Sequence, residues 1–164
     1  MRRPRGTRGP RRIGIGEAAL KGALAGAAGG VAMIVARRAE AEAGMTDGAE
    51  SAAPRAVGRA ARAGGVRMSA DQRALAGAGA QIAAAAAVGA VYGVISSQLR
   101  LPVAAQGSAL AAIVYVANVW GLMPRAGLLE MPTDMPFREA LAPAGTHAVF
   151  GLATVRAFEM LMRR

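Results

Sequence analysis

Two uncharged stretches decide how this chain folds: residues 74–99, ALAGAGAQIAAAAAVGAVYGVISSQL, and residues 101–123, LPVAAQGSALAAIVYVANVWGLM. A helix needs about 20 predominantly apolar residues to cross a bilayer. These stretches hold 26 and 23 residues, and only Arg100 separates them. Pro102 suits the first turn of a helix, so the two stretches predict a tight helical hairpin that crosses a membrane twice.

The composition of the whole chain agrees with this prediction. Of its 164 residues, 42 are Ala and 22 are Gly, whereas aromatic residues make up only 4%. Small side chains supply little of the buried apolar area that drives folding in water. The absence of Cys excludes disulfides and thiolate metal sites, and a single His excludes metal sites built from several histidines. We therefore expect no metal and no other cofactor.

Two further stretches are also expected to be membrane helices. Residues 22–36 are apolar, and they reach spanning length if Lys21 extends its amine to the interface. Residues 141–162 are mostly apolar, although His147, Arg156 and Glu159 interrupt them. The sequence thus predicts an all-α polytopic membrane protein, a four-helix transmembrane bundle. Its predicted spans lie near residues 18–36, 74–98, 102–123 and 142–162.

The first 16 residues differ sharply from the rest of the chain. They contain six Arg and no acid, interspersed with Pro and Gly, so we expect a disordered basic tail that binds anionic lipid headgroups. The arginines with this predicted role are Arg2, Arg3, Arg5, Arg8, Arg11 and Arg12. Residues 17–164 would then form the four-span membrane domain, with a polar loop at residues 37–73.

The polar loop carries two local signals. Residues 54–63 predict a short helix on the membrane surface, with Arg55, Arg59 and Arg62 on one face. The tetrapeptide Ser69-Ala70-Asp71-Gln72 predicts a capping box that starts the second span. After the third span, residues 124–140 contain three prolines and predict an ordered, non-helical link.

The orientation of the bundle follows from the basic residues near the ends of the spans. Lys and Arg number about ten on each side of a four-span arrangement, so the overall count is nearly balanced. The first span usually dominates, and the tail before it is basic without any acid. We therefore expect a multi-pass protein of the cell inner membrane with both termini in the cytoplasm.

Glycines recur at intervals of four along two of the predicted spans. Gly22, Gly26 and Gly30 share one face of the first span, and Gly89 and Gly93 repeat the spacing on the second. Helices in lipid associate through close packing, which such small residues allow. The glycines predict helix packing, within one chain in preference to a dimer. A homo-oligomer or another membrane protein as partner remains an alternative.

Polar residues inside the predicted spans are candidate functional groups. His147 changes charge within the physiological pH range, and it shares a helix face with Gly151 and Thr154. Asn118 or Gln106 from the third span would be its partner in a polar or proton-sensing site. The alternative is a structural, hydrogen-bonded His. Ion pairs at the helix ends are expected for Glu17 with Lys21 and for Arg156 with Glu159.

A set of short motifs in the C-terminal 60 residues or so resembles the YagU-like family of uncharacterised bacterial inner-membrane proteins. The matching positions are Gly121-Leu122-Met123-Pro124, Met131-Pro132-Thr133-Asp134-Met135-Pro136, Glu139, Gly145-Thr146-His147 and Arg163-Arg164. The resemblance implies a four-helix membrane protein with a long loop after the first span and no settled biochemical activity. The spacing between Glu139 and His147 is longer here than in that pattern, which weakens any joint role for the two.

The leading functional hypothesis is an integral inner-membrane protein that is not an enzyme, either stress-related or an accessory subunit, with the lipid bilayer as its partner. One alternative is a small transporter or channel component with a polar path near His147. Another is a basic nucleic-acid-binding protein. This last alternative is disfavoured because no aromatic side chains accompany the Arg clusters and the long uncharged stretches stay unexplained.

Overall fold

All regular structure in the described part of the chain is helical, which confirms the all-α part of the predicted fold class. The computed structural model describes residues 13–44, 52–96, 101–128, 130, 131, 133, 134, 137, 141 and 143–163. Its helices are α1 (Ile15–Glu42), α2 (Ala52–Ala63), α3 (Ala70–Ser96), α4 (Val103–Tyr115), the π-helix η1 (Val116–Leu122), α5 (Met123–Arg125) and α7 (Ala144–Met162). The predicted surface helix at residues 54–63 corresponds to α2.

Three helical stretches within the described residues are long and apolar enough to cross a membrane. They are α1, α3 and the continuous helix of residues 103–125, and they correspond to the first three predicted spans. The fourth predicted span, residues 142–162, corresponds to α7, which is not among these candidates. Helix α7 has only 19 residues, and His147, Arg156 and Glu159 reduce its apolar character.

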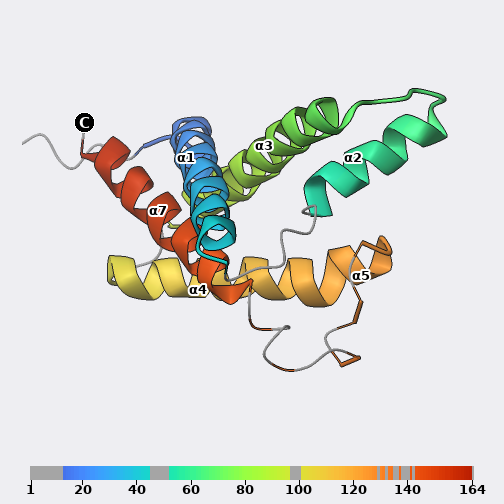
Figure 1. Cartoon of the computed structure of the whole chain (residues 1–164). Helices are drawn as coiled ribbons and strands as arrows, with labels where there is room; N and C mark the ends of the chain where they lie inside the picture. Colours follow the sequence, from blue (N-terminus) through green and yellow to red (C-terminus); the bar gives the residue numbers. More distant parts are fainter. Residues whose placement is uncertain are drawn as a thin grey trace, which may run out of the picture.

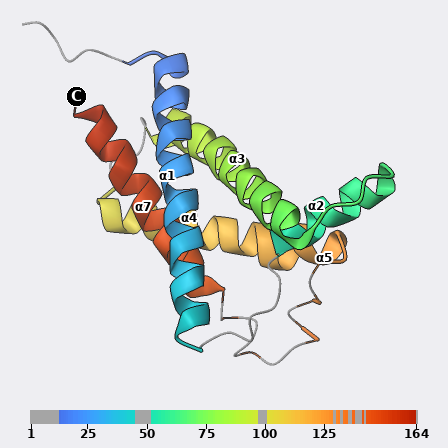
Figure 2. The same ribbon diagram turned by 45° about the horizontal axis from the view of Figure 1, so that its top comes forward.

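The four long helices form a fan in which α7 lies between α1 and α4 (Figure 1). On the other side of α1 lies α3, and α2 folds back on the N-terminal part of α3. Both views show α4 and the segments after it running across α7 (Figure 2). The paired residues at each contact show that α1 and α3, α1 and α7, and α4 and α7 run antiparallel.

The distribution of side chains is the reverse of that in a water-soluble bundle. Large apolar side chains of the long helices point outward, and Leu20, Val91 and Ile113 are 63%, 60% and 67% exposed. The interfaces between helices are built mainly from Gly, Ala and Thr, with a few aromatic rings and the aliphatic side chains of Met33, Leu110 and Val155. Exposed large apolar side chains on helices of spanning length indicate contact with lipid.

Glycines from α1 and α3 meet at the closest helix contact. A Cβ atom placed on Gly22 would lie 2.9 Å from the Cα atom of Gly93, and one on Gly26 would lie 2.8 Å from that of Gly89. A Cβ on Gly30 would lie 2.8 Å from the Cβ of Ala85. Because real Cβ contacts are longer, the two backbones approach as closely as they do only because these side chains are absent.

Glycines also allow close approach on two faces of helix α7, one glycine belonging to α1 and one to α7 itself. Toward α1, a Cβ on Gly29 would contact the Thr154 hydroxyl and lie 2.9 Å from the Phe150 carbonyl oxygen. Toward α4, a Cβ on Gly151 would lie 2.8 Å from the backbone nitrogen of Ala111. The two contacts fix α7 in the middle of the fan.

The third span changes its helical pitch where a proline approaches. Residues 116–122 form the π-helix η1, and the Met123 N–H donates to the Asn118 carbonyl, five residues earlier. Pro124 has no N–H and its ring conflicts with the carbonyl four residues before it. The wider π turn accommodates this residue and rotates the side chains that follow Tyr115.

The start of α3 confirms the predicted capping box. The Gln72 N–H donates to the Ser69 Oγ at 3.2 Å, and the Ser69 N–H donates to the Gln72 Oε1 at 2.8 Å. These reciprocal bonds satisfy two backbone donors that would otherwise lack partners at a helix start. The tight hairpin predicted around Arg100 is bounded by Ser96, the last residue of α3, and Pro102, the N-cap of α4.

Candidate polar site between the helices

His147 is buried in the first turn of α7, with only 3% of its surface exposed. Its Nδ1 lies 2.8 Å from the Pro143 carbonyl oxygen. A carbonyl only accepts hydrogen bonds, so Nδ1 carries a proton and donates it there. The imidazole meets the Tyr115 ring edge to face, with 5.5 Å between the centroids. Among the described residues, the buried Nε2 has no hydrogen-bond partner.

Arg37 of α1 brings charge close to this histidine. Its guanidinium donates to the Gln81 Oε1 of α3 at 3.4 Å and interacts electrostatically with both His147 and Glu40. The Gln81 Nε2 is buried and, within the described part of the chain, unpartnered. The polar site therefore consists of Arg37, Gln81, Tyr115 and His147, one residue from each of the four long helices.

Glu40 completes the charge distribution around the site. One carboxylate oxygen of Glu40 lies 3.6 Å from where a Cβ on Gly145 would stand, so the C-terminal end of α1 approaches the start of α7. The site thus lies toward the end of the bundle at which α1 ends and α7 begins. A position near a helix end allows contact with interfacial water, which a site at the centre of a span lacks.

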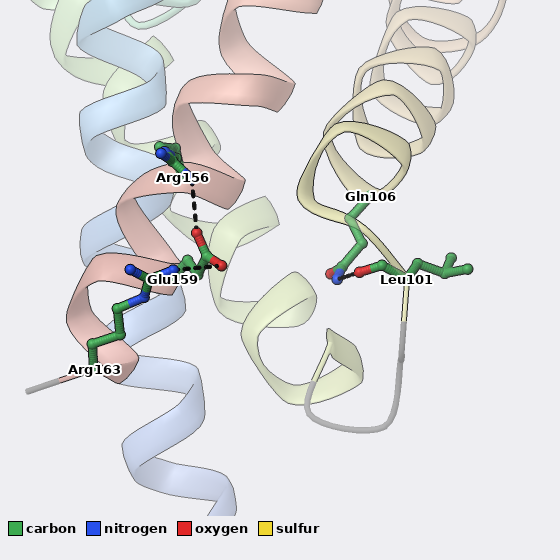
Figure 3. Close-up of polar contacts among 5 residues, drawn as sticks. All are labelled: Leu101, Gln106, Arg156, Glu159 and Arg163. Atoms are coloured by element: carbon green, nitrogen blue, oxygen red, sulfur yellow. Dashed lines mark hydrogen bonds and ion pairs between the residues drawn. The ribbon is translucent and has the colours of Figure 1, made fainter.

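Gln106, which the sequence associates with His147, lies at the opposite end of α4. It accepts a hydrogen bond from the Tyr92 hydroxyl at 2.6 Å. It also donates to the Leu101 carbonyl at 2.7 Å (Figure 3). Gln106 precedes Tyr115 by nine residues, about 13 Å along a helix. The structure therefore places Gln106 with Tyr92 and away from His147.

Asn118, the other predicted partner, lies in η1 and is half-buried. None of the side-chain hydrogen bonds formed by the described residues involves it. The aromatic ring of Tyr115, three residues earlier, faces His147 instead. The predicted group of His147, Asn118 and Gln106 is not assembled by the contacts of the described residues.

Charged pairs occupy the other end of α1 and α7, and both predicted ion pairs are confirmed. The Lys21 amine lies 3.0 Å from the Glu17 carboxylate, and Arg156 lies 3.1 Å from Glu159. Arg163 adds a second contact to Glu159 at 3.2 Å (Figure 3). Since α1 and α7 are antiparallel, the start of α1 and the end of α7 lie at one end of the bundle. Ion pairs there suit a membrane interface.

The tail arginines for which lipid binding is predicted, residues 2–12, lie outside the described residues. In the part of the chain that the structure describes, no three His, Asp or Glu residues are grouped so as to hold a metal ion.

Sequence reasoning missed Arg37 and Tyr115 as members of the polar site. Arg37 follows an apolar run and therefore resembles an ordinary charge that ends a span. Helix α1 continues to Glu42, so this arginine lies within the helix and beside α3 and α7. Tyr115 could have been recognised as a polar aromatic residue inside an otherwise apolar span, which calls for a partner when buried.

Comparisons of the chain with models of known families, with curated proteins and with solved structures found no match.

Proposed function

We propose that this chain is a multi-pass inner-membrane protein with four spans, in which α7 is the fourth, and that it acts as a non-enzymatic accessory or stress-related component of the membrane. The observation that carries this proposal is the distribution of side chains, which is the reverse of that in a water-soluble bundle. Glycine backbones meet in the interior, and Leu, Val and Ile side chains cover the outside. Lipid stabilises such a surface, whereas water does not.

The place of α7 supports its assignment as a span. It packs between two helices that are themselves candidate spans, and Phe150, Thr154 and Val155 are almost fully buried there. A helix held on both sides by spans lies at the same depth as they do. Its charged residues, Arg156 and Glu159, pair with each other in the C-terminal half of the helix, and the exposed Arg156 side chain can extend toward the interface at that end.

The antiparallel contacts support an even number of crossings. Helices α1 and α4 run one way, and α3 and α7 run the other, so residues 13 and 163 lie on one side of the membrane. The basic tail before α1 favours the cytoplasm for that side. The resemblance to the YagU-like family is consistent with this arrangement, and a non-enzymatic role agrees with it.

The absence of native Cys makes the topology directly testable by single-cysteine labelling. Four exposed positions suit the test: Val66, Leu101, Met131 and Arg163. In whole cells, a membrane-impermeant maleimide should label Val66→Cys and Met131→Cys. It should label Leu101→Cys and Arg163→Cys only after the membrane is permeabilised. The protein should also stay in the membrane fraction after an alkaline carbonate wash.

Each alternative outcome has a defined meaning. Equal labelling at positions 131 and 163 would show that α7 does not cross the membrane. An inverted pattern would place both termini outside the cytoplasm. Release by carbonate would overturn the membrane assignment and leave the nucleic-acid-binding alternative as the better hypothesis.

One observation favours a second candidate function, a small transporter or channel component. Three buried polar atoms on α3 and α7 lack partners among the described residues: Gln81 Nε2, His147 Nε2 and Thr154 Oγ1. An unsatisfied polar group inside a membrane protein is costly. Water or a transported ion would satisfy these groups and would give the polar site a role in conduction.

A flux assay in vesicles separates this candidate from the first. If the polar site conducts protons, His147→Gln should abolish acidification of the lumen, because the amide does not titrate. Its titratable neighbours are Arg37 and Glu40 on α1 and Tyr115 on α4. As a matched control, Glu159→Gln removes a titratable group from the other end of α7 and should leave the flux unchanged. No flux through the parent protein, or equal flux through both variants, would exclude the conducting role.

A further inference from the structure

A pocket lined by three arginines lies where α2 meets α3, away from the polar site. Its lining residues are Gly58, Arg62, Arg67, Met68 and Arg73, and its volume is about 270 Å³. Arg62 comes from the end of α2, Arg67 from the connecting turn and Arg73 from the first turn of α3. None of the lining residues is acidic, and within the described part of the chain the Arg62 and Arg67 side chains form no hydrogen bond or ion pair.

The turn that carries Arg67 is built by two capping motifs in succession. At the end of α2, Gly65 has a φ of +76°, in the left-handed region that favours glycine. The Gly65 N–H donates to the Arg62 carbonyl at 3.0 Å and the Val66 N–H to the Ala61 carbonyl at 2.8 Å. This is a Schellman motif, which reverses the chain direction.

The capping box at Ser69 and Gln72 follows after only two residues. Residues 67 and 68 are therefore held between two hydrogen-bonded helix ends. The ordered backbone sets the direction of Arg67 relative to the two helices and lowers the entropic cost of binding a ligand.

Arg73 is the most firmly positioned of the three arginines. Its side chain packs on Gly58, where an added Cβ would lie 2.6 Å from the Arg73 Cδ. Its guanidinium donates to the Met68 carbonyl oxygen at 3.0 Å. These contacts hold a half-buried cation against the wall of the pocket.

Arg62 and Arg67 are both exposed and both line this pocket, and like charges brought together repel one another unless an anion lies between them. A guanidinium pairs best with planar or tetrahedral oxyanions, which accept two parallel hydrogen bonds. We propose that this pocket binds the phosphodiester headgroup of an anionic phospholipid. The inference rests on the proposed membrane location, since the lipid must reach the end of α3.

Neighbouring apolar side chains favour a lipid over a soluble phosphate. Val66, beside Arg67 in the turn, is 55% exposed, and Leu75, one turn into α3, is 78% exposed. Met68 contributes an apolar surface to the pocket itself. A phospholipid would place its phosphate among the arginines and its acyl chains against such side chains, whereas inorganic phosphate would use only the charges.

The test uses the full-length protein in a neutral detergent. Its melting temperature is followed while dioctanoyl phosphatidylglycerol, dioctanoyl phosphatidylcholine or glycerol 3-phosphate is added. The double variant Arg62→Gln/Arg67→Gln leaves the Arg73 contacts intact. The control Arg38→Gln/Arg55→Gln removes the same charge from two exposed residues that do not line the pocket.

Phosphatidylglycerol should raise the melting temperature of the parent and of the control. Its apparent affinity for the pocket variant should be at least about tenfold lower than for the parent, because two charged hydrogen-bonding groups are lost. Phosphatidylcholine and glycerol 3-phosphate should stabilise the parent much less. Equal stabilisation by glycerol 3-phosphate would overturn the lipid assignment, and equal loss in the control would overturn the site. A parent that resists carbonate extraction yet does not respond to phosphatidylglycerol would refute the pocket proposal alone.

Discussion

The Gly26→Leu substitution is expected to force α1 and α3 apart and to destabilise the folded protein by about 3 kcal/mol, the upper end of the usual cost of overpacking. A Cβ at this position already falls 2.8 Å from the Gly89 Cα and 3.0 Å from the Ala85 carbonyl carbon. Those atoms belong to a helix backbone, which does not move aside as a side chain would. The larger leucine therefore requires displacement of the whole of α3, with loss of dispersion contacts that lipid replaces only in part.

Thermal melting of the detergent-solubilised protein measures this effect. Ala28→Leu adds a similar volume on an exposed position of the same helix and should melt close to the parent. If Gly26→Leu does not yield folded protein, Gly26→Ala provides a milder test, with Gly79→Ala as its control because nothing lies within 4 Å of Gly79. Equal melting temperatures for the members of each pair would contradict the close glycine contact.

The helices themselves were largely predictable from sequence because the decisive property, a long uncharged stretch, is local. Residues 74–99 and 101–123 required no knowledge of their neighbours to be identified as helices of spanning length. The capping box at Ser69 was equally local, since its partners are three residues apart. The regular spacing of Gly22 and Gly26 likewise marked a helix face suited to close packing, but did not identify α3 as the helix that meets it.

The candidate site was less predictable because it depends on how the helices are aligned with one another. His147 was singled out by its chemistry, yet its neighbours come from three other helices. The antiparallel alignment of α4 with α7 places Tyr115 beside His147 and takes Gln106 to the far end. The π-helix that begins directly after Tyr115 further alters which side chains face α7, and no regular helical periodicity anticipates that change.

The arginine pocket could not be predicted from the regular spacing of residues along a single helix. The sequence placed Arg62 on one face of a surface helix with Arg55 and Arg59, as a helical spacing requires. In the structure, Arg59 donates instead to the Ala126 carbonyl after α5, and Arg62 lines the pocket with Arg67 and Arg73. The sequence signal that could have identified this group is Gly64-Gly65 followed closely by Ser69. Glycines that end one helix and a capping box that starts the next, so close together, predict a tight, ordered turn.

The contact between α4 and α7 yields the second prediction with a large expected effect. Gly151→Leu should destabilise the protein by about 3 kcal/mol, because a Cβ there already falls 2.8 Å from the Ala111 backbone nitrogen. The change should also separate Tyr115 from His147, which lie about one turn along the same interface. Ala148→Leu, on an exposed position of α7, is the matched control.

Trp120 gives this second prediction a readout that a general loss of stability would not reproduce. It is the only tryptophan of the chain, and it lies in η1, directly after α4, with 45% of its surface exposed. Displacement of α4 by Gly151→Leu should shift the Trp120 emission maximum at temperatures where the protein is still folded. Gly26→Leu acts on the contact between α1 and α3, on the other side of α7, and should leave that emission near the parental value. If Gly26→Leu shifts the emission as much as Gly151→Leu does, the α1–α3 contact and the α4–α7 contact are not independent. That result would contradict the arrangement in which α7 lies between α1 and α4.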